Sequence, residues 1–187
     1  MSRFVPLSEH EQQLIRDVTR VERYGKGTVM LAEGDVARES WLVIQGCVRV
    51  FRGDGDDART LALHTELHLV IPPSYGTGAP SPVSIECLED VVASASTAAE
   101  EARAFAEHPA FESVCRVMGD AFRAHLQQAH IDAVTLTPEQ RYLELVARRP
   151  DLLQRVPQYH IASLLGIQPE TLSRIRRRVV RRVAPAR

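Results

Sequence analysis

The sequence has few cysteines, and none of them is placed for a shared site. Cys47, Cys87 and Cys115 lie far apart, and no CxxC pair occurs among the 187 residues. A disulfide framework and a cysteine-bound zinc or iron–sulfur centre are therefore not expected. Because free cysteine is usually buried, we expect all three to act as small apolar core residues rather than as redox groups.

Long apolar runs are also missing. No stretch approaches the roughly 18 apolar residues that a membrane span needs. The first residues, MSRFVPLSEHEQQLIRDV, lack the apolar segment of a secretion signal. We therefore expect a cytoplasmic protein that does not contact a membrane.

Patterns of catalytic residues are absent as well. No nucleophile, base and orienting group occur together, and the seven histidines show neither HExxH nor Cys-paired spacing. We predict no enzyme activity, no metal site and no cofactor. His64 and His68 could approach each other across a turn and bind a metal or haem, but solvated or core histidines are the favoured interpretation.

Positive charge is concentrated at one end of the chain. From residue 137 to residue 187 there are 11 Arg and no Lys against four acids, for a net charge of +7. The first 136 residues have 12 basic and 20 acidic groups, for a net charge of −8. This difference in net charge predicts a basic module that binds a polyanion, joined to a domain with another function.

The two parts also differ in pattern. In the first, short runs rich in Val, Ile and Leu, such as ESWLVIQGCVRVF, RTLALH and VSIECLED, are broken by Gly, Asp or Pro every 8 to 15 residues. This pattern predicts an antiparallel barrel or sandwich. Two capping boxes, Thr97 with Glu100 and Thr137 with Gln140, then predict helix starts, and the residues after Thr137 have a helical pattern throughout.

A long apolar stripe lies between those capping boxes. Its residues recur at three- and four-residue steps: Phe111, Val114, Cys115, Met118, Ala121, Phe122 and Leu126. This stripe packs either against the protein's own sheet or against the same helix of a second copy, and the residues alone are compatible with both. We therefore expect a β-rich domain at 1–109, a long helix at 110–136 and an all-helical domain at 137–187.

The stretch QYHIASLLGIQPETLSRIRRRV predicts a helix-turn-helix. Gly166 suits the sharp end of one helix, and Pro169 suits the first position of the next. At helical spacing, one side of the second helix is apolar and the other is polar and basic. The apolar side contains Leu172, Ile175, Val179 and Val183, and the opposite side contains Glu170, Ser173, Arg174, Arg177 and Arg181.

This polar side has the chemistry for reading DNA. Arg174 can form a bidentate hydrogen bond to guanine O6 and N7 through its guanidinium group. Glu170 can accept a hydrogen bond from cytosine N4, and Ser173 can bond a base or a phosphate. A basic helix alone is more often a solvated surface. Here the glycine turn, the proline start, the apolar inner side and the separate basic domain together favour DNA binding. Further candidates for phosphate contacts or helix support are Gln168, Thr171, Arg177, Arg178, Arg181 and Arg182.

The stretch LLQRVPQYHIASLLGIQPETLSRIRRRV resembles the helix-turn-helix of the Crp/Fnr transcription regulators, and GTVMLAEGDVARESWLVIQGCVRVF resembles their β-roll. The resemblance implies an α+β fold. It consists of an N-terminal antiparallel β-roll of the cyclic-nucleotide-binding type (a double-stranded β-helix), a long dimerisation helix and a C-terminal all-α DNA-binding domain.

The resemblance also implies roles for single residues. In the family the long helix pairs two subunits, and Glu170, Ser173 and Arg174 fall where such regulators read bases. Two departures stand out: Pro169 replaces a position that is basic in some members, and the residues up to Arg187 leave no room for most or all of a β-hairpin wing. The residues assigned to the dimer helix are Phe111, Val114, Met118, Ala121, Phe122 and Leu126.

The expected sensor lacks a cation for a cyclic nucleotide. Family members that bind one hold its ribose with a Gly-Glu pair and its phosphate with an arginine further along. Here those positions fall near Pro72, Pro73 and Pro82, and no Lys or Arg occurs between Arg59 and Arg103. Because backbone N–H groups alone bind a buried phosphate less strongly, we predict that the roll does not bind cAMP or cGMP in the family's usual way.

The leading hypothesis is a homodimeric transcription regulator that binds a palindromic site on double-stranded DNA, with RNA polymerase as a further candidate partner. The alternative is a ligand-sensing or protein-interaction module whose basic C-terminus contacts another partner.

Overall fold

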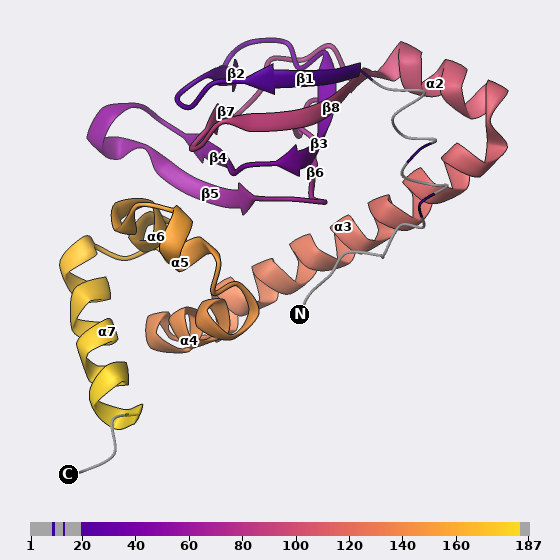
Figure 1. Ribbon diagram of the computed structural model, residues 1–187. Helices are drawn as coiled ribbons and strands as arrows, with labels where there is room; N and C mark the ends of the chain where they lie inside the picture. Colours follow the sequence, from indigo (N-terminus) through magenta and orange to yellow (C-terminus); the bar gives the residue numbers. More distant parts are fainter. Residues whose placement is uncertain (1–8, 10–12, 14–19, 184–187) are drawn as a thin grey trace. The chain divides into compact units, whose positions relative to one another are not determined.

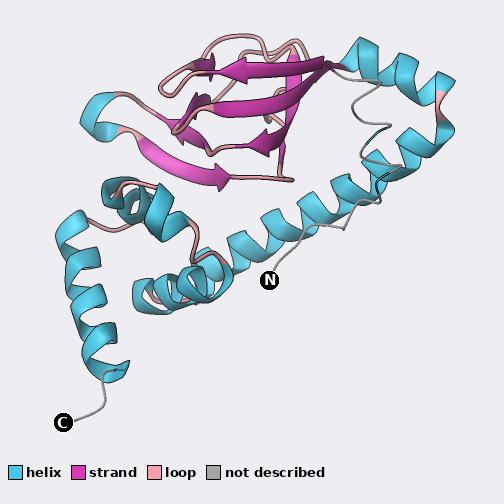
Figure 2. Ribbon diagram, in the orientation of Figure 1, coloured by secondary structure: helices cyan, strands magenta, loops and turns pink. Residues whose placement is uncertain are grey.

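The computed structural model describes residues 9, 13 and 20–183, apart from the side chains of residues 110 and 180–183. The chain divides into two compact units after Leu126. All the described strands belong to the unit that ends at Leu126, and the described part of the other unit is helical (Figure 2).

The unit that ends at Leu126 contains two four-stranded antiparallel sheets (Figure 1). One sheet has the strand order β1-β8-β3-β6 and the other has the order β2-β7-β4-β5. The predicted antiparallel β-roll is therefore confirmed. The strands are β1 Arg20–Tyr24, β2 Val29–Leu31, β3 Glu39–Gln45, β4 Val48–Arg52, β5 Arg59–His64, β6 Leu69–Val70, β7 Ser84–Cys87 and β8 Val91–Thr97, with a short 3-10 helix, η1, at Gly55–Asp57.

Side chains from both sheets fill the interior of the roll. Trp41 and Val43 of β3 are buried there together with Val48 of β4 and Ile85 of β7. Each fully buried aliphatic side chain of this kind contributes roughly 1.5–3 kcal/mol. Since successive side chains of a strand point to opposite faces, β3 also sends Leu42 to the other side of its sheet, where it packs against helices.

The three cysteines lie in apolar surroundings. Cys47 and Cys87 are buried, Cys115 is half-buried, and all three are free thiols. Burial raises the pKa of Cys87 to about 11 and the pKa of Cys115 to about 12. The prediction of apolar core residues is therefore confirmed for Cys47 and Cys87, and the reactive thiolate of Cys87 and Cys115 is suppressed at neutral pH.

Two helices follow β8. The first, α2, spans Ala98–Glu107 and begins with the predicted capping box of Thr97 and Glu100, in which each side chain accepts the other residue's backbone N–H. The second, α3, spans Pro109–Thr135. No described helix combines the length and the apolar character that crossing a membrane requires.

The first part of the α3 stripe packs within its own unit. Phe111, Val114 and Met118 are buried in a cluster with Leu42 of β3 and Ala104 of α2. Three of the six residues assigned to a dimer contact thus serve the chain's own core, because the outer face of the sheet offers them an apolar partner. The other three are less buried: Ala121 and Phe122 are half-buried and Leu126 is 46% exposed.

The described part of the unit that begins at Gln127 contains the end of α3 and four more helices. The predicted capping box of Thr137 and Gln140 is present at the start of α4, with Pro138 in the first turn. Tyr142 of α4, Ile161 of α6 and Leu172 of α7 are buried around one small cavity, so these three helices pack together. The helices are α4 Pro138–Arg148, α5 Leu152–Arg155, α6 Gln158–Leu164 and α7 Pro169–Val183.

Candidate nucleic-acid interface

A tight turn at Gly166 separates α6 from α7. Gly166 has φ +66°, a conformation that glycine adopts without strain. Its N–H donates to the Ser163 carbonyl at 2.9 Å, and the Ile167 N–H donates to the Ala162 carbonyl at 3.0 Å. These two bonds form the Schellman arrangement that ends a helix sharply. Three residues, 166–168, then suffice to start α7 at Pro169.

The α7 helix has one buried side and one exposed side. Leu172 and Ile175 are buried, and Val179 is half-buried. Glu170 and Arg174 are exposed, whereas Ser173 is half-buried. Burial of the apolar side therefore directs the first carboxylate and the first guanidinium of α7 outward.

The base-reading candidates lie in the first two turns of α7. The Arg174 guanidinium donates to the Thr171 hydroxyl at 3.2 Å, so its head lies beside Thr171 in the first turn of the helix. Glu170, as an acid in the first turn, also interacts favourably with the helix dipole. Gln168 precedes the helix, and its carbonyl accepts the N–H groups of Thr171 and Leu172.

The four phosphate candidates differ in what they contact. Arg177 is exposed, and within the described residues no ion pair is formed by it. Arg178 is bound to Glu139 of α4 at 2.5 Å, and the pair ties α7 to α4. Arg181 and Arg182 belong to α7, but their side chains lie outside the described part of the chain.

The partner of Arg178 was not predicted from the sequence. Glu139 lies 39 residues before it, and nothing in the local pattern of either residue points to the other. The same holds for Arg141 of α4, whose guanidinium reaches the α6–α7 turn by donating to the Leu165 carbonyl at 2.8 Å.

In the other unit, residues 71–83 connect β6 to β7, where the resemblance implies a phosphate site. The segment has no Lys or Arg. The Tyr75 hydroxyl donates to the Ser96 carbonyl at 3.4 Å, and the pKa of Tyr75 is raised by burial and by the Glu101 carboxylate. Glu101 in turn accepts from the hydroxyls of Ser40 and Ser96 at 2.7 and 2.8 Å. These contacts bring negative charge to Tyr75, which disfavours an anionic ligand there.

A buried cation does occur in the roll, but it has partners of its own. Arg49 of β4 is only 6% exposed. It donates to Glu86 at 2.7 Å and to Thr60 at 2.9 Å, and it lies 4.3 Å from the centre of the Phe51 ring. Diverting Arg49 to a phosphate would leave the Glu86 carboxylate without this partner, which is costly for a partly buried ion pair.

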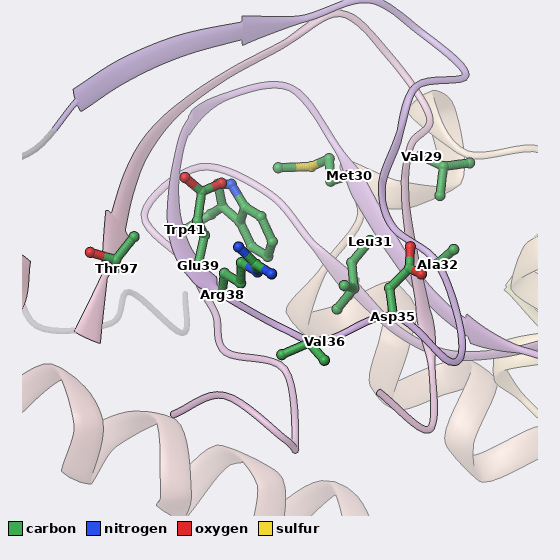
Figure 3. A pocket seen from close by; sticks show the side chains of 10 residues that line it. All are labelled: Val29, Met30, Leu31, Ala32, Asp35, Val36, Arg38, Glu39, Trp41 and Thr97. Atoms are coloured by element: carbon green, nitrogen blue, oxygen red, sulfur yellow. The ribbon is translucent and has the colours of Figure 1, made fainter. Parts of the chain in front are cut away.

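An open groove of about 760 Å³ lies beside the start of β3 (Figure 3). Its polar groups are the carboxylates of Asp35 and Glu39, the guanidinium of Arg38 and the Thr97 hydroxyl. Glu39 is bound by Arg20. The groove therefore presents both signs of charge and is not a specific anion site. Its remaining lining residues are Val29, Met30, Leu31, Ala32, Val36 and Trp41.

His64 and His68 do approach each other, with ring centroids 6.1 Å apart, and both are buried. His125 of α3 lies 6.4 Å from His68 by the same measure. Among the described side chains, no group of three or more His, Cys, Asp or Glu is placed to hold a metal ion. Their burial agrees with core histidines, one of the two interpretations that the sequence favoured.

Comparisons with known proteins address the same two units. Residues 21–108 match the family model described as cyclic nucleotide-binding domain. The fold is similar to that of a CooA variant from Carboxydothermus hydrogenoformans, with 21% identity, coverage of 94% of this chain and 81% of the other, and a TM-score of 0.66. The Thermus thermophilus catabolite activator protein is 22% identical, with coverage of 96% and 86% and a TM-score of 0.57.

The c-di-GMP responsive global regulator CLP from Xanthomonas campestris is 17% identical, with 96% coverage of both chains and a TM-score of 0.70. No curated protein matches the sequence. At these identities the structural similarities establish the fold. Residues 21–108, a little under half of the chain, therefore match the cyclic nucleotide-binding domain family, and the chain has the fold of the CooA, catabolite activator and CLP proteins.

Proposed function

We propose that this chain is a cytoplasmic transcription regulator of the Crp/Fnr type that binds a palindromic DNA site as a homodimer. The observation that carries the proposal is the start of α7. There, Glu170 and Arg174 are exposed directly after a sharp helix-helix turn, while Leu172 and Ile175 are buried behind them. This is the arrangement in which a recognition helix presents its first residues to base edges.

The chemistry of the exposed residues fits a major groove. The guanidinium of Arg174 matches guanine O6 and N7, and the carboxylate of Glu170 matches the amino group of cytosine. Arg177, which is exposed one turn further along, suits a backbone phosphate. In a homodimer, the two α7 helices enter grooves about one helical turn apart, roughly 34 Å.

The exposed part of α3 supports the homodimer. Val117 is 38% exposed and Ile131 is 49% exposed. They lie fourteen residues apart with Ala124 midway, which is the seven-residue spacing of a helix that pairs with another helix. On a helical projection this strip lies beside the Phe111 and Met118 side that packs in the chain's own core.

The proposal is tested by a gel shift of the full chain on mixed-sequence duplexes at two salt concentrations. A DNA-binding regulator retards the duplexes, and its affinity falls steeply with salt. A module whose basic C-terminus contacts another protein gives no retardation at moderate salt, and this outcome would favour the alternative function.

Replacing Arg174 with alanine should cost about 1–3 kcal/mol of binding to the preferred site, because a bidentate contact to guanine is lost. The loss should be confined to one base pair of each half-site, so the variant accepts every base there. The measurement is a competition assay with single-base substitutions of the preferred site. Unchanged discrimination at every position would remove Arg174 from the base-reading set.

Replacing Arg177 with alanine should weaken binding to all sequences alike and reduce the slope of log affinity against log salt by about one, because one phosphate contact is lost. The neighbouring Arg178→Ala is the matched control, since Arg178 is bound to Glu139. It should leave the slope nearly unchanged. Equal slopes for both variants would contradict the distinction between the two arginines.

Replacing Ile131 with glutamate should raise the dimer dissociation constant by about tenfold or more, because pairing would bury an unpartnered carboxylate. Ala129→Glu is the control: Ala129 is exposed and lies opposite the strip on a helical projection. Sedimentation equilibrium measures both variants. If Ile131→Glu dimerises as tightly as Ala129→Glu, the strip is not the contact surface.

Titration of the chain with cAMP or cGMP in a calorimeter should give no saturable heat, because residues 71–83 supply no cation and Glu101 carries negative charge beside them. Tight, stoichiometric binding of either nucleotide would overturn this part of the proposal.

A further inference from the structure

Arg141 on α4 bonds to two other helices at once. Its Nη1 donates to the Ala133 carbonyl of α3 at 2.7 Å, and its Nη2 donates to the Leu165 carbonyl at the end of α6 at 2.8 Å. The guanidinium is planar and presents its donors in a fixed fork, so these two bonds fix the two carbonyls relative to each other.

The Ala133 carbonyl needs this donor because its helical partner is used elsewhere. In a continuing helix, Ala133 would accept the N–H of Thr137, four residues later. That N–H donates instead to the Gln140 side chain at 2.8 Å, as part of the capping box that starts α4. Because Thr137 caps α4, its N–H does not reach the Ala133 carbonyl of α3, and Arg141 donates to that carbonyl instead.

The Leu165 carbonyl is in a similar position at the end of α6. The sharp turn uses the carbonyls of Ala162 and Ser163, which accept from Ile167 and Gly166. Leu165 is the last residue before Gly166, and its carbonyl accepts from Arg141. Neither α3 nor α6 has a basic residue in its last turn, so Arg141 also supplies the positive charge that helix C-termini favour.

We infer that Arg141 is a positioning residue for DNA reading: it fixes the α6–α7 turn, and so the base-reading start of α7, to the last turn of α3. The inference rests on the proposed function. In a homodimer that pairs along α3, the distance between the two recognition helices depends on how firmly each α7 is held to its own α3. Arg141 therefore sets how strictly the protein discriminates between half-site spacings.

The test compares binding of the full-length protein to its preferred site and to versions in which the spacer is one base pair shorter or longer. The ratio of affinities does not depend on the fraction of folded protein, so a variant that is merely destabilised keeps it. Arg141→Met should reduce the ratio by about tenfold, because two bonds to a charged donor are lost.

Two further variants sharpen the comparison. Arg141→Lys keeps the charge and can reach one carbonyl but not both, so it should fold and still lose most of the spacing preference. Arg148→Met is the matched control. It removes the same charge from α4 and breaks an exposed ion pair with Glu144 and one with the half-buried Asp132, but Arg148 bonds no helix-end carbonyl of the described residues.

Hydrogen exchange measured without DNA tests separately whether Arg141 holds the ends of α3 and α6 together. Arg141→Met should speed amide exchange both at 135–138 and at 165–168, whereas Arg148→Met should not. Unchanged exchange, or faster exchange with an intact spacing ratio, would overturn the role of Arg141. A wild-type protein without any sequence preference would instead overturn the proposed function.

Discussion

Burial of the apolar side of α7 is the contact on which the proposed DNA-reading surface depends. Because Leu172 and Ile175 are held inside the helical unit, Glu170 and Arg174 can only face outward. The direction of the helix is set just before it, by the left-handed conformation of Gly166 and the two bonds that close the turn. A side chain at 166 would strain that conformation and misdirect every residue after it.

The proposal that the β-roll does not bind a cyclic nucleotide rests on its charges and not on its fold. The strand order, the packed interior and the family match are those of a cyclic nucleotide-binding domain. The charges around residues 71–83 are nevertheless unsuited to a phosphate, since Glu101 lies close to Tyr75 and Arg49 is committed to Glu86. Because one fold can host different functions, we base the proposed DNA binding on the residues of α7, and the proposed lack of nucleotide binding on the charges of the roll.

Local patterns in the sequence were sufficient for much of the structure. The capping boxes at Thr97 and Thr137 appear as predicted, because they involve residues three positions apart. The roll was predictable from its short apolar runs. The partner of the α3 stripe was not, since Phe111 could equally have packed against a second copy. Contacts over long sequence separations, such as Arg178 with Glu139 and Arg141 with Leu165, leave no periodic signal at all.

In the function proposed above, two copies of this chain read DNA through the start of α7. The most direct measurement is repeated selection of bound duplexes from a random pool by the full-length protein, followed by sequencing. We expect two inverted copies of one short half-site, with centres about one helical turn apart. Recovery of a single asymmetric motif, or of no motif above the pool, would contradict it.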